Sequence, residues 1–173
     1  MIRYIPHNEI NKDKWNSCVC QSLYPTVFAD FYFLTFAVPS WGALVEDDYE
    51  KVMPLPERSK FFVDYVFTPY GFVRLGIFSK EKLTETVVMD FINAIPQRFK
   101  QIDLFLNPEI PSGILEGISV EMVSHKLDLS TGYDIISRSF SENTRRNIRK
   151  AEAFDLVLTN DIEIYEIVEL FKN

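Results

Sequence analysis

The chain has 173 residues, of which 47% are hydrophobic and 14% aromatic, and its formal net charge is −7. This length and apolar content suffice for one ordinary domain core and exclude an intrinsically disordered chain. The acidic balance excludes general attraction to nucleic acid or anionic lipid, so any anion binding has to be local. The longest apolar run, 27–38, contains Asp30 and is too short for a membrane span, and the first residues lack a secretory pattern. We therefore expect a cytoplasmic protein.

The two cysteines, Cys18 and Cys20, lie two residues apart in a segment expected to be helical, where their side chains point to different faces. We expect reduced thiols, because this pair builds neither a disulfide framework nor a metal site. The two histidines, His7 and His125, lack partners at ligand spacing. The sequence therefore predicts no metal site.

The first elements in chain order are a short strand at 3–6 and two helices. Trp15, Val19 and Leu23 recur four residues apart within 11–24, after Asn11 or Asp13 as the N-cap, which predicts a helix. A second helix is expected within 29–38, before Pro39.

A meander of about four strands is expected next, because alternating apolar residues are separated by turn signals. Pro54 and Pro56 favour an edge position or a bulge for the second of these strands. The four segments are 41–46, 51–55, 61–69 and 72–79.

The remaining segments alternate between helices and strands. Ser79 is the expected N-cap of a helix that ends before Pro96. Strands are expected at 101–107 and 118–129, followed by a basic helix from residue 141, a strand at 155–159 and a helix at 162–173.

The basic helix has the sequence SENTRRNIRKAEAF, residues 141–154. Ser139 and Glu142 have capping-box spacing, with Ser141 as a competing cap. At about 100° per residue, four cations spread over roughly 140° of one face, and Thr144, Ile148 and Ala151 fall on the other side. These cations are Arg145, Arg146, Arg149 and Lys150. Residues 141–150 carry four cations and one anion, a net +3, which leaves −10 for the rest of the chain.

Three interpretations of this basic face stay open. Charged helix faces are usually solvated. The face can also be neutralised internally by the acidic side of the last helix, which carries Glu163, Glu166 and Glu169. The third interpretation is anion recognition, because the arginine guanidinium suits bidentate contact with phosphate or carboxylate.

The run DLSTGYDIISRSFSENTRRNIRKAEAFDLVL, residues 128–158, resembles the segment that joins the two lobes of the Fem-type aminoacyl and peptidyl transferases. In that family a DL pair precedes a loose helix, a T-R-x-N-I-x-K-A helix and a strand. The matching residues are Asp128, Leu129, Thr144, Arg145, Asn147, Ile148, Lys150 and Ala151. Residues 41–56 and 74–79 also resemble the first lobe of such proteins.

The resemblance implies an α/β fold of the GNAT acyltransferase type, with a central, mixed, largely antiparallel sheet and helices on both faces. It also implies transfer of an acyl or aminoacyl group to an amine acceptor, with a nucleotide-linked or aminoacyl-tRNA substrate. Arg145, Arg146, Arg149 and Lys150 would then bind substrate phosphate or carboxylate groups. Tyr32 and Tyr70 are further candidates, because family members bind substrate in a cleft of this lobe.

Two departures from the family pattern affect the expected site. The loop that cradles acyl-CoA in GNAT enzymes has no counterpart in residues 74–83, where Gly76 stands alone, so no cofactor is expected for this lobe. A two-lobed member needs about twice this length. We therefore expect a GNAT-like lobe at 1–130, followed at 131–173 by the basic helix and the start of an incomplete second lobe. No catalytic residue is assigned.

Two alternatives from other classes remain. One is a non-catalytic module that binds RNA or a phosphorylated ligand through the basic helix. The other is a structural lobe that forms a homodimer by burying the apolar stripe of its C-terminal helix. This stripe consists of Ile164, Ile167, Val168 and Phe171.

Overall fold

The structure is a computed structural model. It describes residues 1–72, 74–106, 110, 113–115, 117, 119–120, 122–123, 125, 127–154 and 161–171. The chain divides into two compact units, Met1–Ser124 and His125–Asn173, which are described separately.

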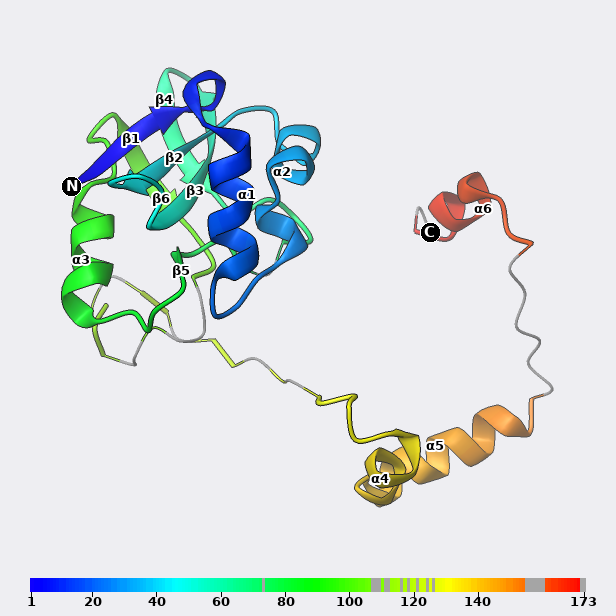
Figure 1. The fold of residues 1–173 in the computed structure, drawn as a ribbon. Coiled ribbons are helices and arrows are strands. Elements are labelled where there is room, and N and C mark those ends of the chain that lie inside the picture. Colours follow the sequence, from blue (N-terminus) through cyan, green and yellow to red (C-terminus); the bar gives the residue numbers. More distant parts are fainter. Residues whose placement is uncertain are drawn as a thin grey trace. The chain divides into compact units, whose positions relative to one another are not determined.

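The first unit is built on a six-stranded sheet (Figure 1). Its strand order is β1-β2-β3-β4-β6, and β5 pairs with β3. All pairs are antiparallel except β4 and β6, which are parallel. The sheet is thus mixed and largely antiparallel, as expected. The strands are β1 (Ile2–Pro6), β2 (Trp41–Glu46), β3 (Lys51–Lys60), β4 (Val63–Phe67), β5 (Phe78–Ser79) and β6 (Phe99–Asp103).

Three α-helices, α1 (Lys12–Gln21), α2 (Phe31–Ala37) and α3 (Glu85–Asn93), cover the sheet. Each helix has an oxygen-bearing N-cap that accepts N–H groups of the first turn: Asn11, Asp30 and Thr84. Short 3-10 helices, η1 (His7–Glu9) and η2 (Val27–Ala29), precede α1 and α2.

The core consists of two clusters on opposite faces of the sheet. Successive residues of a strand point to opposite faces, and Leu44 and Val45 of β2 belong to different clusters. One cluster includes Trp15 of α1 and Leu34 of α2, and the other includes Phe91 of α3. Helices therefore pack on both faces, with α1 and α2 on one and α3 on the other.

Two expectations around β5 are wrong. Ser79 does not cap α3; it is buried in β5, and its hydroxyl accepts the N–H of Glu81. Pairing of Phe78–Ser79 with β3 keeps this segment extended, so the helix begins only after Thr84. The strand expected at 72–79 is limited to β5, and the described residues 74–77 lie outside strands.

Of the two alternatives for the strand with Pro54 and Pro56, an edge position or a bulge, the edge position is wrong, because β3 pairs with β2 on one side and with β4 and β5 on the other. The prolines lie between the ladders to β5, at residues 51–52, and to β4, at residues 57–60. Glu57 donates its N–H to the Ser40 carbonyl at 2.9 Å, on the β2 side. Successive backbone nitrogens of a strand point to alternate sides, so the nitrogens of Pro54 and Pro56 point away from β2, toward the gap between the β5 and β4 ladders. No strand of the described residues pairs with β3 in that gap, so the missing N–H groups of the prolines cost no ladder hydrogen bond.

A further strand was expected at 118–129, but the residues described in this range belong to neither helices nor strands. The strand expected at 155–159 lies outside the described residues. In the parts of the chain that the structure describes, no helix is both long and apolar enough to cross a bilayer.

The second unit contains α4 (Tyr133–Arg138), α5 (Glu142–Glu152) and α6 (Ile164–Leu170). The basic helix is therefore confirmed as a helix. Of its two candidate caps, Ser141 is the one used, because its hydroxyl accepts the N–H of Thr144 at 3.1 Å. Ser139 instead donates its hydroxyl hydrogen to the carbonyl of Ile136.

Candidate functional site

Helix α5 presents its four cations to solvent. The side chains of Arg145, Arg146, Arg149 and Lys150 are exposed, and Thr144 and Ile148, four residues apart, are half-buried on the other side. Ala151, expected on the less exposed side, is exposed as well. Helix α5 therefore carries its four cations on one face, opposite the half-buried Thr144 and Ile148.

The three arginines of α5 donate hydrogen bonds to residues nearby in the sequence. Arg145 donates to the Arg138 carbonyl at 2.7 Å, and Arg146 donates to Oδ1 of Asn143 at 2.6 Å. Arg149 contacts the carbonyl of Arg145 at 3.4 Å. These acceptors are neutral, so the contacts orient the guanidinium groups and leave their positive charge in place.

The acidic residues proposed as internal partners have a role within α6. Glu163 and Glu166 form a capping box at the start of that helix, where the Glu163 N–H donates to Glu166 Oε2 at 3.0 Å. These two carboxylates therefore satisfy the N-terminal N–H groups of their own helix.

The two candidate tyrosines lie on the surface of the first unit. Tyr32 is 61% exposed in the first turn of α2, and its hydroxyl lies 3.3 Å from Nζ of Lys12. This hydrogen bond raises the pKa of Lys12. Tyr70 is fully exposed in the turn that follows β4. The four cations belong to the other unit, so the six predicted residues do not form one site within either unit.

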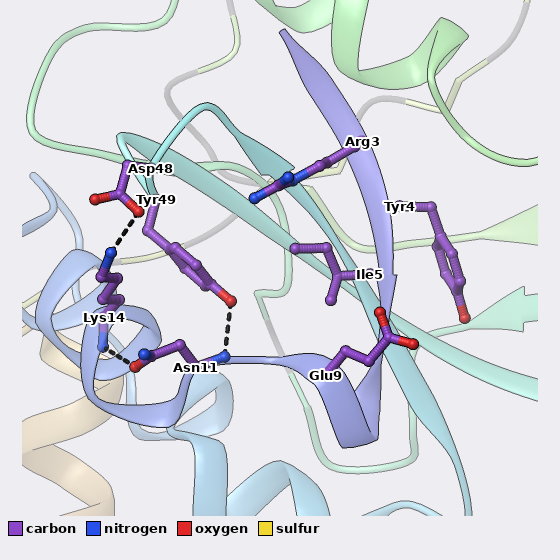
Figure 2. A pocket seen from close by; sticks show the side chains of 8 residues that line it. All are labelled: Arg3, Tyr4, Ile5, Glu9, Asn11, Lys14, Asp48 and Tyr49. Carbon is purple, nitrogen blue, oxygen red and sulfur yellow. Dashed lines mark hydrogen bonds and ion pairs between the residues drawn. The ribbon is translucent and has the colours of Figure 1, made fainter.

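A recess of about 380 Å³ lies beside the start of β1 and was missed by the sequence analysis (Figure 2). Lys14 pairs with Asp48 across 2.5 Å, and the backbone N–H of Asn11 donates to the Tyr49 hydroxyl at 2.7 Å. Two non-glycine residues of the β2–β3 turn, Asp47 and Tyr49, have positive φ angles of 46° and 67°. The lining residues are Arg3, Tyr4, Ile5, Glu9, Asn11, Lys14, Asp48 and Tyr49.

The recess is lined mainly by polar and charged side chains. Lys14 and Asp48 neutralise each other, and the lining set contains no serine, cysteine or histidine. The sequence feature that borders this recess is the acidic turn at 46–48. Its Asp47 and Asp48 side chains are exposed, and they pair with the amino terminus and with Lys14.

A polar network lies on the α3 face of the sheet. Arg98 donates to the Tyr4 hydroxyl at 2.9 Å and to Glu57 at 2.6 Å, and the guanidinium lies 4.2 Å from the centroid of the Phe99 ring. Burial and the Glu57 charge raise the pKa of Tyr4. The Tyr4 ring lies so close to Gly42 that a Cβ there would approach its atoms to 2.4–2.6 Å. Tyr4 also packs against the core cluster that includes Phe91 of α3, so the network lies at the border of that cluster.

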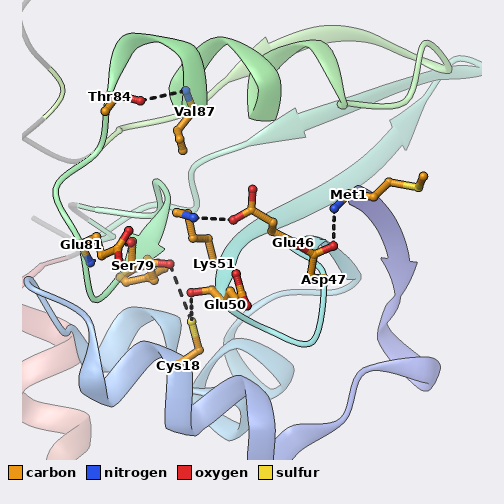
Figure 3. A network of polar contacts seen from close by, with 11 residues as sticks. Met1, Cys18, Glu46, Asp47, Glu50, Lys51, Ser79, Glu81, Thr84 and Val87 are labelled. Carbon is orange, nitrogen blue, oxygen red and sulfur yellow. Dashed lines mark hydrogen bonds and ion pairs between the residues drawn. The ribbon is translucent and has the colours of Figure 1, made fainter.

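Cys18 is a buried thiol in a second polar network (Figure 3). Its Sγ–H lies 3.7 Å from the carbonyls of both Glu50 and Phe78, and burial raises its pKa to about 11. A thiol of this kind remains protonated and unreactive at neutral pH. Cys18 and Cys20 are both free, as expected, and Cys20 is exposed on the other side of α1.

Within the described ranges, no three His, Cys, Asp or Glu side chains gather as metal ligands. Comparison of the chain with protein family models, with curated proteins and with solved structures found no match.

Proposed function

We propose that this chain is the N-terminal lobe of a Fem-like acyl or aminoacyl transferase, and that α5 binds the phosphate groups of a nucleotide-linked or aminoacyl-tRNA substrate. The observation that carries the phosphate-binding role is the set of four exposed cations on one face of α5, in a chain of net charge −7. The acyl-transfer role rests on the resemblance of residues 128–158 to the Fem-type linker segment.

Two features of the fold support the GNAT-type assignment. The sheet is mixed and largely antiparallel, with helices on both faces. A loose helix, α4, precedes the basic helix, in the order that the resemblance implies. The proposal assigns no cofactor to this lobe and places no catalytic residue in it.

In the proposed reaction, the amine of an acceptor attacks the activated carbonyl carbon of the donor ester, and the tRNA 3′ oxygen leaves. The cations of α5 contribute by holding substrate phosphates in place, which turns an encounter between two substrates into a reaction within one complex. Arg149 and Lys150 lie four and five residues past Arg145 and are exposed, so both can make such contacts.

Binding of a fluorescent single-stranded RNA across a salt series tests the phosphate contacts. Each phosphate contact contributes about 0.7 to the slope of log K against log salt for single strands. We expect Arg149→Gln/Lys150→Gln to weaken binding at low salt and to reduce the slope by about 1.4. The matched control is Lys80→Gln/Lys82→Gln, which removes the same charge from an exposed segment of the first unit and should leave the slope unchanged.

An equal reduction by both double variants would show that net charge, rather than α5, determines binding, and would contradict the proposal. Release of the aminoacyl group from charged tRNA, in the presence of a nucleotide-linked amine acceptor, would show transfer directly. Salt-dependent binding through α5 without release is the result expected both of a lobe without catalytic residues and of the non-catalytic binding module.

The structural alternative is favoured by one observation on α6. Its apolar residues are exposed, including Ile164 at 79% and Phe171 at 87%. A dimer that buries this surface would show a concentration-dependent mass in sedimentation, lost in Ile164→Ser/Phe171→Ser and insensitive to anions.

A further inference from the structure

We propose that the tip of the β3–β4 hairpin, Phe61 and Phe62, inserts into the surface of an anionic phospholipid bilayer. This inference goes beyond the proposed function and concerns a different unit of the chain. Three independent observations support it: the backbone conformation of the tip, the exposure of its rings and the charge around it.

The tip has a backbone conformation that its residues disfavour. Lys60 and Val63 are the last paired residues of the hairpin, so Phe61 and Phe62 form a two-residue loop (Figure 1). Both have positive φ angles, 52° and 64°. Tight hairpin loops of this kind favour Asn-Gly, because a side chain with a Cβ is strained there. Two large aromatic residues at these positions do not help the turn to form, which points to a role outside the fold.

The rings are presented to solvent to an unusual degree. Phe61 is 85% exposed and Phe62 is fully exposed, and the neighbouring Val63 is 44% exposed. These side chains therefore form a small apolar wedge at the turn between β3 and β4. Neither ring belongs to a core cluster.

The charge around the wedge is positive in an acidic chain. The ammonium group of Lys60 lies 5.4 Å from the centroid of the Phe61 ring. Lys100 lies at the irregularity of the β4–β6 ladder, opposite Asp64 and Tyr65, and is exposed. Arg98 is paired with Glu57 at 2.6 Å and with Asp64 at 3.8 Å, so Lys60 and Lys100 are the cations that remain beside the tip. Three cations and two carboxylates thus give this end of the sheet a local charge of +1, which leaves −8 for the rest of the chain.

An anionic bilayer is the occupant that matches this combination. Aromatic rings prefer the interface between headgroups and acyl chains, and so do lysines, whose apolar stems can lie along the rings while their ammonium groups stay in water. Cations beside such rings are attracted by anionic headgroups. The acidic remainder of the chain is screened beyond about 8 Å at physiological ionic strength, so the lysines beside the tip govern its approach. A symmetric contact between two tips would place their cations against each other, which disfavours a dimer formed through this hairpin.

Tryptophan fluorescence measures insertion directly, because the native Trp15 and Trp41 are buried and give a constant background. We expect Phe62→Trp to show a blue shift with vesicles of 30% phosphatidylglycerol in phosphatidylcholine, and quenching by brominated acyl chains. Tyr70→Trp is the matched control, since Tyr70 is equally exposed but follows the opposite end of β4. Its emission should not change.

A second variant separates binding from folding. Phe61→Asn/Phe62→Gly supplies the residues that the turn prefers, so we expect an unchanged or higher midpoint of thermal unfolding together with loss of sedimentation with the vesicles. Arg149→Gln/Lys150→Gln should keep the vesicle binding, which distinguishes this surface from α5.

Four results would overturn the inference. They are an emission of Phe62→Trp that is unaffected by vesicles, equal shifts for Phe62→Trp and Tyr70→Trp, retention of vesicle binding in Phe61→Asn/Phe62→Gly, and burial of the tip in a protein dimer or by RNA in the absence of lipid.

Discussion

The guanidinium of Arg145 donates a hydrogen bond to the carbonyl oxygen of Arg138, 2.7 Å away, and so connects the basic helix α5 to the last residue of α4. The terminal carbonyls of a helix lack intrahelical partners, and a cation there also interacts favourably with the helix dipole. Arg145 therefore combines a structural contact with its place on the cationic face.

Because of this contact, we expect two substitutions that each remove one positive charge from α5 to have different effects. Arg145→Gln should weaken α4 by about 0.5–1.5 kcal/mol, because a charged hydrogen bond to a helix terminus is lost. Arg149→Gln should have a smaller effect, since its contact at 3.4 Å is long. Amide hydrogen exchange of residues 133–140 reports the difference. Equal exchange in both variants would show that the Arg145–Arg138 bond contributes nothing to α4.

We predict that the position of the Tyr4 ring requires glycine at residue 42. Gly42→Ala would place a Cβ within 2.4–2.6 Å of Tyr4 atoms, so the ring has to move and the hydrogen bonds of its hydroxyl weaken. We expect a loss of about 1–3 kcal/mol in the free energy of unfolding, measured with urea. In a Tyr4→Ala background the same change should cost little. A cost that is the same in both backgrounds would place the strain elsewhere.

The two cysteines are predicted to differ strongly in reactivity. Burial raises the pKa of Cys18 to about 11, and access to its sulfur is blocked, whereas Cys20 is exposed. Iodoacetamide at pH 8 should therefore label one thiol per folded chain, and Cys20→Ser should react only after denaturant is added. Rapid labelling of the folded Cys20→Ser variant would contradict the buried placement of Cys18.

The ion pair of Lys51 and Glu46 predicts a loss of stability at high pH. The two atoms lie 2.5 Å apart with both side chains largely buried, and the hydrogen bond to Glu46 raises the pKa of Lys51 (Figure 3). A lysine whose pKa is higher in the folded state than in the unfolded chain stabilises the fold. This stabilisation is fully present at pH values below the unfolded pKa and is lost as the pH rises through the folded pKa.

Lys51→Met should consequently lose less stability between pH 9 and pH 11.5 than the unchanged chain, as measured by urea unfolding. Tyr4 and Cys18, whose pKa values are also raised, weaken the fold over the same range. Because burial raises the pKa of Cys18 and the Lys51 charge lowers it, the comparison is made with Cys18→Ala in both proteins, so that the difference isolates Lys51. Parallel pH profiles would show that the ion pair contributes no net stability.

The sequence by itself determined the elements whose signals are local. Helix α1 begins after Asn11, and α5 follows Ser141, because a side-chain oxygen at the N-cap and the apolar spacing act within a few residues. The alternating residues of β4, and the turn signal between β2 and β3, likewise predicted strands, whereas the mixed sheet was implied by the family resemblance. The concentration of cations on one face of α5 could also be read from residue spacing alone.

Only the tertiary structure decided which partners those elements take. Pairing with β3 holds Ser79 in β5 and moves the start of α3 to Glu85, although Ser79 is a good cap by local criteria. Pro54 and Pro56 are accepted in a central strand because they fall between two ladders. The recess beside β1 and the Tyr4–Glu57–Arg98 network join residues far apart in sequence, and such contacts depend on strand register and packing, which no short window of sequence contains.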